Sequence, residues 1–428
     1  MAALNYTRSS GLNALLLRSF AELVGDTELN RHLKRIRAAL RSREVVSPAS
    51  IARYSIPIGL SRFYGRRITE IRNLTLSKEP ELYDAFAFVA GAVEFSRHMS
   101  PSARSILKGR VLSALKPAFD ARPLAHEFRT AFCFAQQGWD IEFSDFEGKA
   151  RHDFLARQGE TSLEIECKTI TADCGSAVHR EEFELLGNDL LRRLKKLNLS
   201  GTSVRIDVAL ADRLPKDSGS KGEIVGAIEQ MLTSPITSAL VRGTSITLQR
   251  YGRSPLSDKD LQASAVRLME NIREECNGSV FGFFSKSQFI AIHLFSTRKS
   301  IVGESISDTI AEASPQFSKS KPAIVCAHFT DLADPELNLL IQSSKDGKPT
   351  LLEAVATKMF NDKKHDHIAA LFFTAQAPVG RFDGQGTIIH TPYFSERGTL
   401  YPLWNKNCRL NEPFEVLAFK SPPSILSR

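Results

Sequence analysis

Two carboxylates and an ammonium group occur close together in the segment from Arg151 to Ile170. Glu166 and Lys168 are separated by one residue, and Asp153 lies shortly before them. Carboxylate oxygens are the protein ligands that Mg²⁺ prefers, and a nearby ammonium group stabilises negative charge that develops on an oxygen. Together these residue types suit metal-assisted hydrolysis.

The elements that must position these groups are two strands joined by a turn. Apolar and charged residues alternate along the second strand, which predicts two faces of different character. One face carries Leu163, Ile165 and Cys167, and the other carries Glu164, Glu166 and Lys168. The first strand is predicted at 152–157, and Gly159 in the turn tolerates a positive φ. The hairpin is therefore expected to bring Asp153 beside Glu166.

This arrangement resembles the PD-(D/E)xK nuclease superfamily, whose core is the restriction-endonuclease-like fold. The matching residues are Asp153, Glu166 and Lys168, and His152 stands where the family name has proline. The family often adds a carboxylate on the helix before the first core strand, and Glu127 is placed for that role. The resemblance covers about residues 120–210 and implies a nuclease.

The resemblance implies a role for each residue. Asp153 and Glu166 would supply two oxygens to Mg²⁺, for which Mn²⁺ can substitute, and the backbone carbonyl of Cys167 would supply a third. Lys168 would hold or deprotonate the attacking water, and Glu127 would bind a second metal ion or its water. The alternative is a structural cluster of ion pairs, because such clusters also gather in clefts.

Other motifs in the chain do not point to a different enzyme. Three further acidic-x-Lys triplets, at 147–149, 346–348 and 362–364, lie in polar or turn-like runs where charges are solvated. His126 and Glu127 begin like a zincin signature, but position 130 is threonine. The chain has neither a GxxxxGK[ST] loop nor a GxSxG motif, which excludes a P-loop ATPase and a hydrolase elbow.

The flanking elements follow from hydrophobic periodicity. A helix at 123–137 and a strand at 139–146 are predicted before the hairpin, and a helix at 178–197 and a strand at 203–210 after it. This order, a helix, three strands, a helix and a strand, is the core order of the family fold. Further strands are predicted at 245–250, 288–295, 323–329 and 368–374, and further helices at 222–232, 259–273, 304–313 and 350–360.

The predicted fold class is α/β. A restriction-endonuclease-like mixed sheet flanked by helices is expected at 119–380, after a basic all-helical domain at 1–118 and before an irregular segment at 381–428. Past residue 214, either the first sheet continues or a second α/β layer packs beside it.

Composition indicates a globular protein outside the membrane. Of 428 residues, 42% are hydrophobic and 24% are charged, and no apolar run is long enough to span a bilayer. Six cysteines are scattered without a CxxC pair, which argues against structural zinc and disulfides and favours the cytoplasm. The leucine-rich stretch Leu12 to Phe20 is read as an amphipathic helix, with an organellar presequence as the alternative.

The basic excess lies in the first 120 residues, which hold 19 Lys+Arg, 15 of them Arg, against 10 Asp+Glu. Arginine matches phosphate oxygens with a planar fork, so a nucleic acid is a candidate partner. The candidate contacts are Arg35, Arg62, Arg66 and Arg67, together with Arg180 after the hairpin. The alternatives are a solvated helical face and an acidic protein partner.

These observations lead to one expected function and one alternative. The expected function is a Mg²⁺-dependent nuclease that acts on DNA rather than RNA. The resemblance adds roles in bacterial defence, repair or mobile-element biology, with a protein partner in such a complex. The alternative is an inactive nucleic-acid-binding or scaffolding subunit that retains the nuclease fold.

Overall fold

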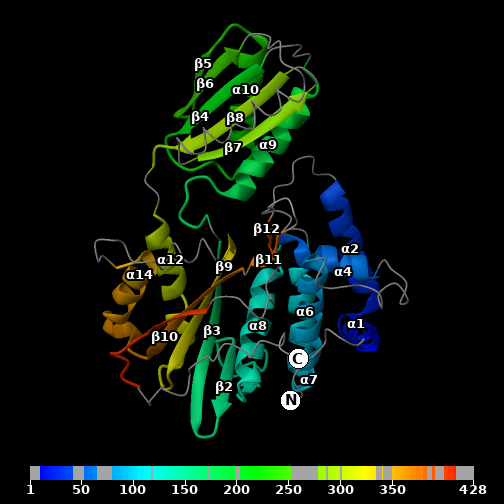
Figure 1. The fold of residues 1–428 in the computed structure, drawn as a ribbon, viewed down its shortest axis with the longest axis vertical. Coiled ribbons are helices and arrows are strands. Elements are labelled where there is room, and N and C mark those ends of the chain that lie inside the picture. Colours follow the sequence, from blue (N-terminus) through cyan, green and yellow to red (C-terminus); the bar gives the residue numbers. More distant parts are fainter. Residues whose placement is uncertain are drawn as a thin grey trace. The chain divides into compact units, whose positions relative to one another are not determined.

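The computed structural model describes residues 10–41, 53–64, 80–116, 119–171, 173–197, 203–251, 278–285, 288–298, 301–333, 340, 349–376, 378–382, 388–390 and 400–410. These residues form two compact units (Figure 1). The first unit draws on Met1–Arg41, Ile51–Ala172 and Gly303–Arg428, and the second on Ser42–Ser50 and Asp173–Val302. The second unit therefore interrupts the first in sequence.

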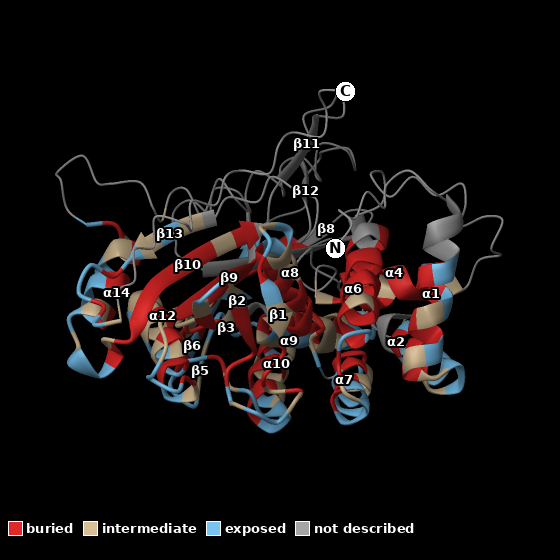
Figure 2. Cartoon of the chain, turned by 90° about the horizontal axis from the view of Figure 1, so that it is seen from below, coloured by how far each residue is buried: buried red, intermediate tan, exposed pale blue. Residues whose placement is uncertain are grey.

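Helices make up the first part of unit one. They are α1 (Ser10–Val24), α2 (Asp26–Arg41), α4 (Ser55–Tyr64), α6 (Pro80–Ser96), α7 (Pro101–Ala114) and α8 (Arg122–Gln136). Ser100 caps α7 by accepting a hydrogen bond from the backbone N–H of Ala103, and Pro101 occupies the first turn. Helix α6 is buried over most of its length (Figure 2), as expected of a helix that is apolar on nearly every side.

The sheet of unit one is mixed. Its strands are β1 (Asp140–Glu142), β2 (Phe154–Gln158), β3 (Thr161–Thr171), β9 (Ala323–Ala333), β10 (Ile368–Gln376) and β13 (Leu400–Trp404), in the order β1-β2-β3-β9-β10-β13. The pairs β3/β9 and β9/β10 are parallel, and the other neighbours are antiparallel. Helices α12 (Val302–Ala311) and α14 (Leu351–Phe360) precede β9 and β10 in the chain.

The N-terminal helices share one core with this sheet. A single hydrophobic cluster contains Phe20 of α1, Phe88 of α6 and Phe128 of α8 together with Ile165 of β3 and Ile324 of β9. The helices of 1–118 are thus part of the sheet-containing unit and do not form the separate domain that was predicted. The reason is that α8 packs on the sheet and α6 packs on α8, a pairing that helical periodicity alone does not specify.

Unit two has a sheet and a core of its own. Its elements are α9 (Arg180–Leu194), β4 (Ser203–Leu210), α10 (Ser218–Thr233), β5 (Ser238–Val241), β6 (Thr244–Tyr251), β7 (Gly278–Ser285) and β8 (Gln288–Ser296). The strand order is β5-β6-β4-β8-β7, with β4 and β8 parallel and the other neighbours antiparallel. Leu186 and Leu190 of α9 and Ile228 of α10 pack on Ile206 of β4 and Ile292 of β8.

Several predicted elements therefore belong to a different sheet than expected. The helix and strand predicted at 178–197 and 203–210 are α9 and β4 of unit two, and α12 and β9 follow β3 in the fold of unit one. The strand predicted at 139–146 is shorter, because a turn begins at residue 144. The segment at 381–428 contains strands β12 (Ile388–His390) and β13, and the helix predicted at 259–273 lies outside the described residues.

Two smaller features complete the description. Strand β11 (Pro378–Phe382) pairs with β12 in a separate two-stranded sheet. None of the helices in the described ranges combines the length and the apolar composition needed to cross a membrane.

Candidate active site

The β2–β3 hairpin brings the predicted catalytic residues together. Phe154 pairs with Ile165 in the antiparallel register, so Asp153, one residue earlier, lies level with Glu166. The backbone N–H of Cys167 donates a 2.6 Å hydrogen bond to Asp153 Oδ2. The turn contains Gly159 with φ of +58°, which confirms the predicted hairpin and the reason for its glycine.

Lys168 is the direct counter-ion of Glu166. Its Nζ lies 2.9 Å from Glu166 Oε1, while Glu166 Oε2 accepts no hydrogen bond from any described residue. Glu166 is only 3% exposed because β3 lies inside the sheet and its partner residue on β9 is Val325. The charged face of β3 is thus buried, and a buried carboxylate oxygen without a donor is unfavourable unless a proton or a cation compensates it.

Glu164, the third charged residue of that face, takes no part in this pair. Its Oε2 accepts a 2.8 Å hydrogen bond from the backbone N–H of Ser318 and lies 4.0 Å from His152 Nδ1. The Glu164 carboxylate thus has its hydrogen-bond donor in the segment that leads into β9. Glu164 is therefore a structural residue at the opposite end of the strand from Lys168.

Glu127 reaches the site from helix α8. Pro123 lies in the first turn of this helix, and its apolar face, which includes Phe128 and Ala131, is fully buried in the core. Glu127 borders that face, as its sequence position predicted. Its Oε2 lies 3.6 Å from Arg110 Nη1 and accepts no hydrogen bond within the described part of the chain.

Two residues of the site were missed by the sequence interpretation. Asp145 lies in the turn between β1 and β2, and its Oδ2 is 2.5 Å from Nη2 of Arg110 on α7. The Arg110 guanidinium also lies over the ring of Phe146, 4.8 Å from its centroid. Arg110 therefore bridges Asp145 and Glu127. Neither residue belongs to a motif, and the strand predicted at 139–146 ends before Asp145, so only the three-dimensional fold identifies them.

The four carboxylates perturb one another. Burial raises the pKa of Glu127 to about 8, with Asp145 and Glu166 adding to the rise while Arg110 and Lys168 oppose it. Burial, followed by the charges of Glu127 and Glu166, raises the pKa of Asp153 well above its ordinary value. Burial also raises the pKa of Glu166, against the effect of Lys168. The site has more negative than positive groups and therefore favours the uptake of a proton or a cation.

The donor set of the site suits a hard cation. Glu166 Oε2 and Glu127 Oε2 are carboxylate oxygens without hydrogen-bond donors among the described residues. Mg²⁺ typically takes one or two carboxylates from a protein and keeps several waters. Within the same described ranges, no group of three or more His, Cys, Asp or Glu side chains is arranged to hold a metal ion. The oxygen atoms of the site are thus of the type that Mg²⁺ binds, but the protein would supply few of the ligands of the ion.

Cys167 is a core thiol and not a nucleophile. Burial and the nearby charge of Asp153 raise its thiol pKa well above the ordinary value, so the thiol is protonated at neutral pH. Its Cα pairs with that of Cys326 on β9, in the middle of the sheet. The predicted role of Cys167 remains that of its backbone carbonyl.

The predicted nucleic-acid contacts are described only in part. Arg35 of α2 and Arg62 of α4 are exposed, whereas Arg66, Arg67 and the side chain of Arg180 lie outside the described residues. The aromatic residues next to Arg62 belong to the fold: Phe63 is buried, and the Tyr64 hydroxyl donates a 2.6 Å hydrogen bond to Leu17 O. Of the residues predicted to contact nucleic acid, α4 therefore presents Arg62 alone, while Phe63 and Tyr64 serve the fold.

Comparison with known proteins gives no match: no protein-family model, no curated protein and no solved structure is significantly similar to this chain.

Proposed function

We propose that this chain is a metal-dependent nuclease that hydrolyses phosphodiester bonds, in DNA rather than RNA. The observation that carries the proposal is the pairing of Asp153 with Glu166 and Lys168 on a buried hairpin, beside two further carboxylates. This buried set has too few cations for its carboxylates, and the pKa values of Glu127 and Asp153 are raised, a feature common in functional sites. Roles in defence, repair or mobile elements, with a protein partner, extend the same proposal.

The topology supports a restriction-endonuclease-like core. When unit two is treated as an insertion after β3, the remaining order is α8, β1, β2, β3, α12 and β9. This is again a helix, three strands, a helix and a strand, the core order of the family that the sequence resembles. The core order along the chain that the resemblance implies would then take its fifth and sixth elements from 302–333 and not from 178–210.

Each residue has a role that follows from its position. Asp153 and Glu166 would hold Mg²⁺, and the bound ion supplies a Lewis acid that lowers the pKa of a water. Lys168, 2.9 Å from Glu166, would hold the attacking water and stabilise charge on the phosphate oxygens. Glu127, whose pKa is raised to about 8 by burial, would bind a second metal ion or its water.

One observation favours the alternative of an inactive binding subunit. The contacts between Asp153 and the Cys167 N–H and between Glu166 and Lys168 already occupy one oxygen of each carboxylate. An inactive subunit would keep these contacts as a structural cluster. The two functions differ in whether a divalent ion activates cleavage.

A cleavage assay separates the two functions. Plasmid, linear duplex, single-stranded DNA and RNA are each incubated with the protein and Mg²⁺ or Mn²⁺. Lys168→Ala should lower cleavage by at least about 100-fold, because it removes a group that acts on the reacting atoms, while folding is retained. The matched control is Lys149→Ala, which removes an exposed lysine from another acidic-x-Lys triplet in the same unit. Full activity of Lys168→Ala would refute the assignment of the site, and no cleavage by the wild type under any of these conditions would favour the binding subunit.

A further inference from the structure

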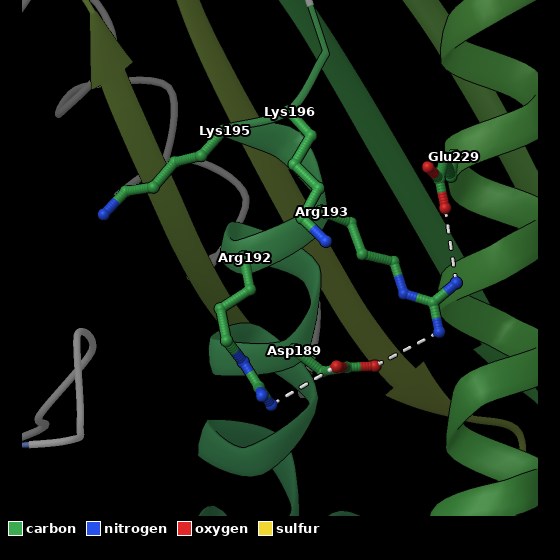
Figure 3. A pocket seen from close by; sticks show the side chains of 6 residues that line it. All are labelled: Asp189, Arg192, Arg193, Lys195, Lys196 and Glu229. Atoms are coloured by element: carbon green, nitrogen blue, oxygen red, sulfur yellow. Dashed lines mark hydrogen bonds and ion pairs between the residues drawn. The ribbon is translucent and has the colours of Figure 1, made fainter.

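Unit two carries a basic hollow on its surface. The hollow has a volume of about 540 Å³ and lies where the end of α9 meets α10 (Figure 3). Four cationic and two anionic side chains line it: Arg192, Arg193, Lys195, Lys196, Asp189 and Glu229. The positive residues thus exceed the negative ones at this surface, although the sequence after residue 120 has no basic excess overall.

Arg193 of α9 links the two carboxylates that line the hollow. Its Nη1 lies 3.2 Å from Glu229 Oε2 on α10, and its Nη2 lies 3.6 Å from Asp189 Oδ2. The guanidinium also lies against α10 at two glycines: a Cβ added at Gly226 would come within 3.8 Å of Nη1, and one at Gly222 within 3.9 Å of Nη2. These distances are ordinary van der Waals contacts, so Arg193 lies directly against this face of α10.

Asp189 and Glu229 both form ion pairs with arginines. Asp189 Oδ1 lies 3.3 Å from Arg192 Nη2, and its Oδ2 faces Arg193, as Figure 3 shows. Lys196 is exposed and ion-pairs with none of the described residues, and Lys195 is exposed beside it. The lining therefore keeps a net positive charge, to which the exposed Lys196 contributes.

A simple helix-capping role accounts for only part of this charge. Cations in the last turn of a helix interact favourably with its macrodipole, and Arg192 and Arg193 occupy that turn. Lys195 and Lys196 follow the last helical residue, and the pair lies beside arginines that are already present. The hollow therefore has more cations than the end of α9 requires.

We propose that this hollow docks the phosphate backbone of a nucleic acid, at a distinct surface from the carboxylate site of unit one. The inference rests on the proposed nuclease function, which supplies a phosphate polymer as the partner. The Arg192 fork can contact phosphate oxygens in pairs, and Lys195 and Lys196 act as mobile point charges. Each phosphate contact releases condensed counterions, so binding here adds affinity that does not depend on base sequence.

The test compares two double variants of the full-length protein. Lys195→Glu with Lys196→Glu reverses the exposed charges of the hollow. Arg213→Glu with Lys216→Glu reverses two exposed cations of the same unit, in the loop after β4, and changes the net charge by the same amount. Binding of a labelled DNA duplex is followed by fluorescence anisotropy across a salt series with EDTA, so that cleavage does not interfere.

The hollow variant should bind more weakly, and the slope of log K against log salt should become shallower by about 1.8, the value for two lost phosphate contacts. The control variant should match the wild type. Equal slopes for the hollow variant and the wild type would overturn the docking surface. It would also be overturned if the wild type bound no nucleic acid at low salt, which is the result expected if the hollow binds an acidic protein instead.

The two proposals fail in different ways. If the wild type cleaves DNA but the hollow variant keeps its salt dependence, the nuclease function stands and the docking surface is wrong. If the hollow variant loses affinity but the wild type cleaves no nucleic acid with either metal ion, the docking surface stands and the nuclease function is wrong.

Discussion

Glu127 is a carboxylate whose surroundings oppose its ionisation. Its pKa is raised to about 8 in the folded protein, mainly by burial and further by the charges of Asp145 and Glu166. The folded state therefore holds this proton more tightly than the unfolded state does. The resulting stabilisation is fully present below the ordinary glutamate pKa of 4.5 and is lost as the pH rises through about 8.

This linkage gives a prediction for the metal-free protein. Its free energy of unfolding should fall between pH 5 and pH 8.5, by up to about 1.4 kcal/mol for each pH unit and proton. Glu127→Gln should reduce that fall, because glutamine does not ionise. Urea denaturation at several pH values in EDTA measures the effect, and Glu160→Gln in the exposed hairpin turn is the control. A pH dependence in Glu127→Gln identical to that of the wild type would show that Glu127 does not hold the proton.

Arg110 contributes a positive charge to the same group of carboxylates. It is the cation nearest to both Asp145 and Glu127, so Arg110→Gln leaves two largely buried carboxylates without their counter-ion. We expect the variant to lose about 1–3 kcal/mol of stability at pH 8 without metal. Added Mn²⁺ should restore more stability to this variant than to the wild type.

The control for Arg110 lies on the same helix. Lys108 pairs with Glu28 at 3.3 Å, and both side chains are about two-fifths exposed. Lys108→Gln should cost less than about 1 kcal/mol and should show no added response to Mn²⁺, because an exposed ion pair contributes little. Similar losses in the two variants would mean that Arg110 is an ordinary surface residue.

At the scale of elements, the crossing of α6 and α8 fixes the position of Glu127. Gly91 of α6 lies so close to α8 that an added Cβ would be 2.7 Å from Phe128 Cβ. Phe128 directly follows Glu127 and is fully buried. The absence of a side chain at position 91 therefore lets the two helices pack closely and holds the first turns of α8 against the core.

Gly91→Ala should therefore force the helices apart. We expect a loss of about 1–3 kcal/mol from overpacking, together with a loss of cleavage as Glu127 moves. Gly109→Ala on α7 is the matched control: no atom would lie within 4 Å of its Cβ, and alanine favours an exposed helix by up to about 1 kcal/mol. Urea midpoints and cleavage rates of both variants test the prediction, which fails if Gly91→Ala is as stable as Gly109→Ala.

The sequence predicted the positions of helices and strands better than it predicted which strands pair in a sheet. The alternation in β3 and the glycine of its turn are local, so they sufficed to place Asp153 beside Glu166. Sheet membership depends on contacts between distant segments, and β9, whose residues from Ala323 to Phe329 are all buried, has no alternation that distinguishes its two faces. For this reason β4 was assigned to the first sheet. Arg110 and Asp145 were missed for the same reason, since their contact joins a helix to a turn.

At the scale of the whole molecule, the two units have separate hydrophobic clusters. One includes Phe88 and Phe128, and the other includes Ile228 and Ile292. Thermal unfolding should therefore show two transitions. Ile228→Ala removes a fully buried side chain from the second cluster and should lower one transition by the equivalent of about 2–5 kcal/mol.

Val89→Ala is the complementary change in unit one, where this valine is also fully buried. It should lower the other transition and leave the one that responds to Ile228→Ala in place. Differential scanning calorimetry of both variants decides the matter, and a single transition lowered equally by either change would show that the units unfold as one.

The parallel pairing of β3 with β9 also affects the order in which the protein folds. Thr171 pairs with Thr330 in this register, so the whole of unit two is synthesised before β3 can meet its partner. Closing so long a flexible loop is entropically unfavourable, and such long-range contacts slow folding. If unit two folds first, it shortens the effective loop. A nascent chain would then keep β3 paired with β2 alone until the second sheet had formed.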